Sequence, residues 1–131
     1  MGTSQKARAR PAPPLPSEAA VLSQAVANAA RLWGLSNELL GRIIGVSGPT
    51  ASRLRGGTWQ LERGTKPFEL SQYFVRLFRS LDSLTGSDDQ ASVSWLKSDN
   101  RDLDGHPIDL IVTIRGLFEV ADYVDDFRAR V

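Results

Sequence analysis

The chain has 131 residues, of which 24% are charged and 41% hydrophobic, with no cysteine and one histidine. This length suits one domain, or two small ones that share a core. The lack of cysteine excludes a disulfide scaffold, a thiolate zinc site and a cysteine nucleophile. A single histidine argues against a serine hydrolase triad and against a multi-histidine metal site.

The net charge of +1 is the sum of two unequal halves. Residues 1–66 carry nine Lys/Arg and three Glu, a net charge of +6. Residues 67–131 carry seven Lys/Arg and twelve Asp/Glu, a net charge of −5. This asymmetry indicates two different partners, although chance clustering on solvated surfaces gives the same pattern.

Residues 1–16 hold four of the seven prolines, together with three basic residues between Lys6 and Arg10. A segment of this composition cannot bury enough apolar surface to fold alone, so we expect a disordered tail. It lacks the apolar run of a signal peptide, and the sequence has no run of about eighteen apolar residues. We therefore expect a cytoplasmic protein with no membrane partner.

The remainder predicts an all-α fold, because apolar residues recur at helical spacing and no stretch alternates with a period of two. Three helix starts are predicted at Ser17, Ser36 and Ser47, and the corresponding ends at Gly34, Gly45 and Gly56-Gly57. A longer helix is expected from Pro67, and shorter ones from a Ser87–Gln90 capping box and from Pro107. Gly116 is expected to break the chain before a last helix, whose apolar stripe is Leu117, Val120, Val124, Phe127 and Val131.

The most informative part of the first half is a pair of short helices that meet at Gly45-Val46-Ser47. Gly45 can adopt the left-handed conformation of a tight turn, and Val46 can fill the corner. DNA-reading helices present N-terminal side chains to base edges, and nearby hydroxyls and arginines to phosphates. The candidate DNA-binding residues are Ser47, Gly48, Pro49, Thr50, Ser52, Arg53 and Arg55. A purely structural helical hairpin has the same spacing, but the basic charge and the serine cap favour DNA binding.

This stretch resembles the Xre-type (Cro/repressor-like) helix-turn-helix, in which a Gly-Val-Ser turn precedes the reading helix. The resemblance implies that Gly48, Pro49, Thr50 and Ser52 face the bases and that Arg53 contacts a base or a phosphate. Gly48-Pro49 departs from the pattern, which usually has a longer polar side chain there. Modest sequence readout is therefore expected, with more of the binding energy from phosphates.

A denser pattern follows in the second half, and it comprises Trp95-Leu96, Asn100, Leu103, Gly105, Pro107–Ile111, Gly116-Leu117, Val120, Tyr123-Val124 and Arg128. It describes three short helices joined by tight loops, with Asp109 in a first turn that favours a carboxylate. From about residue 88 to 131 it resembles the toxin-binding domain of the Xre/MbcA/ParS family of bacterial antitoxins.

The resemblance implies an antitoxin of a type II toxin–antitoxin system, without catalysis, cofactor or metal. Its partner would be a RES-domain toxin that consumes NAD or transfers ADP-ribose, and Tyr123–Val131 would reach the toxin's active site. The basic, aromatic-lined pocket expected there suits Asp122, Asp125, Asp126 and the terminal carboxylate of Val131. The implied toxin-binding residues are Tyr123, Asp126, Phe127, Arg128, Arg130 and Val131.

These expectations together divide the chain into four segments. They are a disordered basic tail (1–16), a helix-turn-helix DNA-binding region (17–66), a linking core or dimerisation helix (67–86) and a toxin-binding domain (87–131). Operator DNA is the expected second partner, bound by a homodimer within a toxin–antitoxin hetero-oligomer, because one short helix reads only a half-site.

Two alternatives stay open. The stripe of the last helix also fits simple packing into the domain's own core, with an acidic, solvated outer face. The whole chain also fits a stand-alone helix-turn-helix transcriptional regulator whose C-terminal domain only dimerises. Arg76 and Arg79, on the long helix, are expected on a solvated face.

Overall fold

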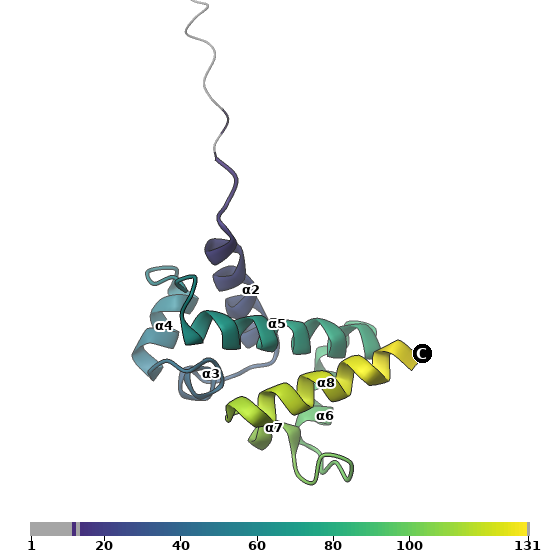
Figure 1. Ribbon diagram of the computed structural model, residues 1–131. Helices are drawn as coiled ribbons and strands as arrows, with labels where there is room; N and C mark the ends of the chain where they lie inside the picture. Colours follow the sequence, from purple (N-terminus) through teal and green to yellow (C-terminus); the bar gives the residue numbers. More distant parts are fainter. Residues whose placement is uncertain (1–11, 13, 131) are drawn as a thin grey trace, which may run out of the picture.

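The computed structural model describes residue 12 and residues 14–130, and this part of the chain is built from helices without any β-strand (Figure 1). Labelled as in Figure 1, the helices are α2 (Glu18–Leu32), α3 (Asn37–Ile44), α4 (Gly48–Gly56), α5 (Lys66–Leu84), α6 (Asp89–Lys97), α7 (Pro107–Leu110) and α8 (Ile114–Arg130). The all-α prediction is confirmed. None of these helices combines the length and the apolar character needed to cross a bilayer. The expected disordered tail falls almost wholly on residues 1–11 and 13, which lie outside the described residues.

The three predicted serine caps are confirmed. The hydroxyl oxygens of Ser17, Ser36 and Ser47 accept a hydrogen bond from the amide three residues later, at 3.0, 3.1 and 3.2 Å. Each such cap stabilises its helix by about 1 kcal/mol, because it satisfies an amide that the helix itself leaves without a partner. The C-terminal ends of α3 and α4 also depend on single local residues, because Gly45 and Gly57 take the left-handed conformation at φ 82° and 83°.

Two of the predicted boundaries in the second half are wrong. Asp88, rather than Ser87, caps α6, and its carboxylate accepts from the Ala91 amide at 3.1 Å. Ser87 lies outside the helix at φ 63°. Gly116 lies inside α8, so the chain bends before it, between Leu110 and Ile114.

Gly116 is needed for a close approach rather than for a bend. A Cβ atom at this position would lie 1.9 Å from the Leu110 carbonyl oxygen, so only glycine lets α8 pass the end of α7. The Thr113 hydroxyl oxygen accepts a hydrogen bond from the Gly116 amide at 3.0 Å, which gives a partner to one of the free amides at the start of α8.

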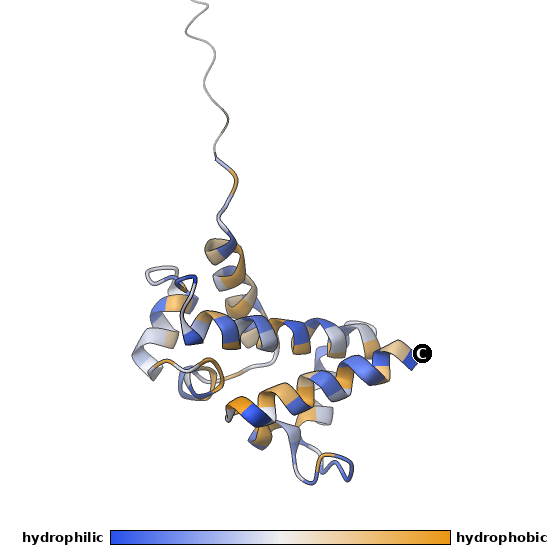
Figure 2. Cartoon of the chain, viewed as in Figure 1, coloured by the Kyte–Doolittle hydropathy of each residue, from blue (hydrophilic) through white to orange (hydrophobic). Residues whose placement is uncertain are grey.

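Helix α5 is the central helix of the molecule and packs against helices of both halves. It crosses the middle of Figure 1, with α2, α3 and α4 around its first half and α8 running beneath most of its length, while α7 packs on α8 and α6 packs on α7 and α5. Its side chains Phe74 and Leu77 are fully buried, and they belong to one apolar core that draws on both halves. Figure 2 shows the banding of apolar and polar residues along α5 and α8 that such two-sided burial requires.

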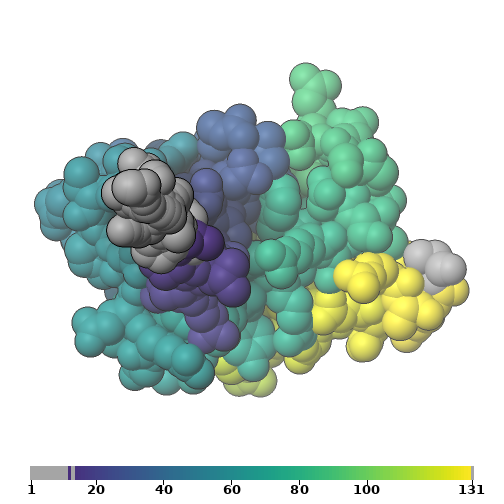
Figure 3. Space-filling view, turned by 90° about the horizontal axis from the view of Figure 1, so that it is seen from above, coloured from purple at the N-terminus to yellow at the C-terminus, as the bar shows by residue number. Residues whose placement is uncertain are grey.

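The two ends of the molecule face away from each other. Seen from above in Figure 3, the region of α4 and the loop after it lies on one side, and α6 with the C-terminal part of α8 on the other. The segment expected to link the two halves is therefore a shared core element. Its expected role in dimerisation stays a prediction.

Replacing Gly116 by alanine is expected to lower the free energy of unfolding by about 3 kcal/mol, because the new methyl group overlaps the Leu110 carbonyl. Gly56, in α4, is the matched control, since a Cβ there meets nothing within 4 Å. Gly56→Ala is expected to be neutral or to raise stability by up to about 1 kcal/mol. Denaturant unfolding measures both, and equal effects would contradict the close-approach explanation.

Candidate functional site

Helices α3 and α4 form a tight pair around the turn at Gly45–Ser47. The amides of Gly45 and Val46 both donate to the Gly41 carbonyl oxygen, at 2.8 and 2.9 Å. A Cβ atom on Gly41 would lie 2.4 Å from the Val46 carbonyl oxygen, so this position also requires glycine. Sequence reasoning missed Gly41, although a glycine four residues before the turn glycine was a visible signal.

One face of α4 is free of the core. Pro49, Ser52, Arg53 and Gly56 are exposed along a single helical stripe, whereas the opposite face buries Ala51 and Leu54 in the core that both halves share. This arrangement follows from the helical period, because positions three and four apart share a face. The exposed stripe therefore contains three of the predicted DNA-binding residues.

A short chain of hydrogen bonds runs along the start of α4. The Ser47 hydroxyl donates to the Thr50 hydroxyl oxygen at 3.0 Å, and the Arg53 guanidinium donates to the same oxygen at 3.1 Å. The guanidinium is thus held beside the N-terminal turn of α4. The structure brings together Ser47, Thr50, Ser52 and Arg53 on one polar surface, which we call the α4 surface.

Gly48 and Arg55 are placed differently from these residues. A Cβ atom on Gly48 would lie 3.3 Å from Glu38 Cγ, so this position faces α3 and offers only its main chain to a ligand. The half-buried Arg55 donates from Nη1 to the Leu35 carbonyl oxygen at 2.6 Å and to Asn37 Oδ1 at 3.2 Å. Arg55 therefore ties α4 to the start of α3, and its contact with DNA stays a prediction.

On the other side of the molecule, ion pairs join α8 to α5. Arg76 Nη2 donates to Asp122 Oδ1 at 2.5 Å, and its Nε lies 2.7 Å from Asp125 Oδ2 without the alignment of a hydrogen bond. The Ser80 hydroxyl donates to Asp125, and Arg128 donates to Ser80 at 3.4 Å. Arg79 is exposed as expected, whereas Arg76 is only partly so, because α8 folds back along α5 and its carboxylates pair with the guanidinium.

Aromatic packing strengthens the same contact. The rings of Tyr73 and Phe118 stack with their centroids 4.0 Å apart, and the Arg76 guanidinium lies 5.1 Å from the Tyr73 ring centroid. Stacked rings and a cation over a ring are both favourable beyond simple burial. This flank of α8 is therefore occupied within the chain.

The inner face of α8 packs into the core, as the simpler of the two alternatives predicted. Leu117, Val120 and Val124 are all at most 1% exposed. Phe127 belongs to the same sequence stripe but is 47% exposed. Packing into the chain's own core thus accounts for the stripe up to Val124 and no further.

The remaining flank of α8 carries a row of three rings, which we call the aromatic strip. Trp95 from α6 lies roughly parallel to Tyr123, with centroids 6.4 Å apart, and Tyr123 contacts Phe127 at 5.8 Å. Trp95 and Tyr123 are half-buried, so the exposed part of the strip grows toward Phe127.

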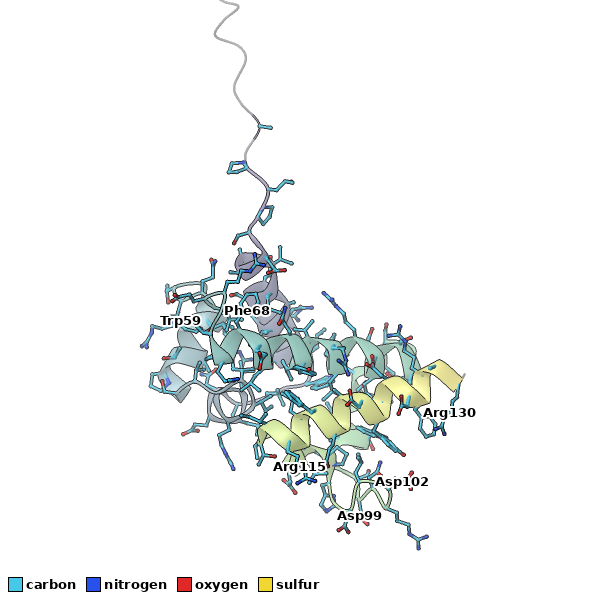
Figure 4. All side chains as sticks on the ribbon, in the orientation of Figure 1. Trp59, Phe68, Asp99, Asp102, Arg115 and Arg130 are labelled. Atoms are coloured by element: carbon cyan, nitrogen blue, oxygen red, sulfur yellow. The ribbon has the colours of Figure 1, made fainter. Side chains whose placement is uncertain are left out.

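A hairpin formed by residues 98–106 lies beside the aromatic strip. Its ends are joined by paired main-chain hydrogen bonds between Asn100 and Gly105, and Tyr123 donates its hydroxyl to Asp102 Oδ2 at 2.8 Å. Figure 4 shows Asp99 and Asp102 on this hairpin below α8, with Arg130 near the end of the helix. The Asp102 hydrogen bond, and then burial, raise the pKa of Tyr123 above its ordinary value.

The other predicted toxin-binding residues lie at the end of α8. Asp126, Arg128 and Arg130 are exposed there, and Val131 lies outside the described residues. No three metal-ligating side chains gather anywhere between residues 14 and 130, and the acidic residues of the hairpin are no exception.

Asp102→Asn is expected to lower the pKa of Tyr123, because the carboxylate accepts the hydroxyl proton and so favours the protonated phenol. A pKa raised by folding stabilises the protein fully below the ordinary tyrosine pKa of about 10, and this stabilisation is lost as the pH rises through the folded-state value. Ultraviolet titration in a Tyr73→Phe background isolates Tyr123, since the chain has two tyrosines. Asp99→Asn is the control, and an equal shift there would argue against the specific hydrogen bond.

Comparison with known families agrees with this geometry. Residues 13–76 match the family model for the antitoxin Xre-like helix-turn-helix domain, and residues 80–130 match that for the antitoxin Xre/MbcA/ParS C-terminal toxin-binding domain. No curated protein matches the chain at a significant level. The first match contains the α4 surface, and the second contains the aromatic strip and the whole of α8.

Domains of these two kinds are non-catalytic in general, and they pair a DNA-binding region with a region that binds a toxin. The boundary between the two matches falls within α5, the helix whose burial both halves share. The chain belongs to the Xre/MbcA/ParS family of antitoxins, with a DNA-binding helix-turn-helix domain followed by a toxin-binding domain.

Proposed function

We propose that this antitoxin neutralises a RES-domain toxin, which consumes NAD or transfers ADP-ribose from it, and that it binds operator DNA to regulate its own operon. The toxin class comes from the family resemblance. The observation that carries the double role is the separation of the two surfaces, since the α4 surface and the end of α8 lie on opposite sides of one shared core. DNA and toxin can therefore be bound by one folded chain at the same time.

The α4 surface suits a phosphate-dominated contact. It offers hydroxyls and one positioned guanidinium, while Gly48 and Pro49 supply no long polar side chain for base edges. Binding energy that comes mainly from phosphates depends strongly on salt concentration. A single α4 reads one half-site, so we expect a dimer or a toxin-bridged oligomer on half-sites about 34 Å apart.

The end of α8 suits insertion into a cleft. None of residues 125–130 is buried, and Asp126, Phe127, Arg128 and Arg130 are all exposed. This last stretch can therefore enter a partner without unfolding the antitoxin. A toxin that accepts an anionic dinucleotide needs cations in its cleft, and Asp126 is the exposed carboxylate nearest to the tip.

Arg53→Ala is expected to weaken operator binding and to reduce the slope of log K against log salt by about 0.9, the value for one lost phosphate contact. The probe is the DNA immediately upstream of the antitoxin gene, titrated at several salt concentrations. Arg79→Ala is the matched control, because it removes the same charge from an exposed position on α5. An unchanged slope for Arg53→Ala would overturn the α4 surface as the DNA contact.

A chain that ends at Phe127 is expected to fold and to bind DNA, yet to lose inhibition of the toxin. Truncation before Tyr123 is a poorer test, because it removes Val124 from the core and Asp125 from its ion pair with Arg76. The measurement is NAD loss caused by the RES-domain protein of the neighbouring gene, with and without antitoxin. Inhibition equal to that of the full chain would contradict occlusion by the tip, and a neighbourhood without a toxin gene would favour a stand-alone regulator.

A further inference from the structure

We propose that the aromatic strip is the anchor that holds the toxin, and that Trp95 of α6 is one of its contact residues. This inference rests on the proposed function and deepens it. It separates two tasks within the toxin-binding domain, because the strip would supply most of the binding energy and the tip of α8 beyond Phe127 would supply occlusion.

The faces of α8 leave one apolar surface open to a partner, beside a charged outer face. The inner face is buried in the core through Val120 and Val124. The flank toward α5 is occupied by the Arg76 ion pairs and by the stack of Phe118 on Tyr73. The flank that carries Tyr123 and Phe127 is the remaining apolar one, and Trp95 extends it onto α6.

The composition of the strip is that of a binding hot spot. Tryptophan, tyrosine and arginine are enriched where truncation to alanine costs most of the affinity, and Arg130 lies close enough to Tyr123 to lower its pKa through its charge. Phe127, at 47% exposure, continues the half-buried rings of Trp95 and Tyr123, and a contiguous apolar surface of this kind is typical of an interaction site. Aromatic rings also bury a large area with few rotatable bonds.

The strip is already in place before any partner arrives. Trp95 and Tyr123 pack against the core. The Tyr123–Asp102 hydrogen bond holds the hairpin against one side of the aromatic strip. Within the hairpin, Asn100 Oδ1 accepts the Leu103 amide at 3.1 Å, in addition to the paired Asn100–Gly105 bonds. A surface fixed in this way loses little conformational entropy on binding.

The charged residues around the aromatic strip indicate the chemistry of the partner surface. The hairpin is acidic, with Asp99, Asp102 and Asp104 against Arg101, and Asp126 adds a further exposed carboxylate beside Phe127. The matching toxin surface is therefore an apolar slot for the rings, rimmed by lysine or arginine toward these carboxylates and by a carboxylate toward Arg130. This slot lies beside the cleft that the tip would occlude.

The test measures the affinity of the full-length antitoxin for the RES-domain protein encoded by the neighbouring gene. Trp95→Ala and Phe127→Ala are each expected to weaken binding about 30-fold or more, the scale of a hot-spot residue. Ile114→Ala is the matched control, because Ile114 is 49% exposed on the same helix but lies outside the strip. It is expected to leave the affinity unchanged, and Trp95→Phe is expected to restore most of it.

Phe127 lies outside the buried core, so Phe127→Ala is expected to leave the fold intact, and its result stands even if Trp95→Ala unfolds the domain, which thermal unfolding of each variant reveals. The chain that ends at Phe127 keeps the three rings and loses the rim contact of Arg130, so it is expected to keep most of its affinity. Tight binding by both alanine variants, together with loss of binding by the truncated chain, would overturn the anchor and leave the tip as the holding element. Failure of the wild-type chain to bind this protein would instead overturn the proposed toxin class, and the anchor with it.

Discussion

The shared burial of α5 is the constraint on which the rest of the molecule depends. Phe74 and Leu77 are completely enclosed, with α2 and α3 on one side and α8 on the other. Two separate cores in 131 residues would each be small and marginally stable, and in this fold one helix serves both halves. This single core sets the positions of the α4 surface and the aromatic strip relative to each other.

The apolar stripe of Leu117, Val120 and Val124 decides which way α8 faces, because its burial in the core sets the inner side of the helix. The ion pairs of Arg76 with Asp122 and Asp125 reinforce this orientation. The Arg76 side chain is 41% exposed, so each pair stabilises the fold by no more than about 1 kcal/mol. The pairs hold the acidic flank of α8 against α5, and the aromatic flank faces outward.

The two charged halves have different physical meanings once the fold is known. In the basic half, Arg53 lies on the surface, whereas Arg55 donates hydrogen bonds within the helix-turn-helix. In the acidic half, Asp122 and Asp125 share one partner, Arg76, whereas the hairpin and Asp126 carry exposed carboxylates. The net charges of +6 and −5 therefore do not say which charged side chains face a partner.

The sequence by itself determined the helix order, the three serine caps, the glycine turn and the family, because each of these depends on residues within a few positions of one another. Its errors were the cap of α6 and the role of Gly116, where a contact with Leu110 overrides the local preference for a bend. Only the tertiary structure decided that α8 folds along α5. That contact joins Arg76 to a carboxylate 46 residues later, and no local pattern specifies a pairing over such a distance.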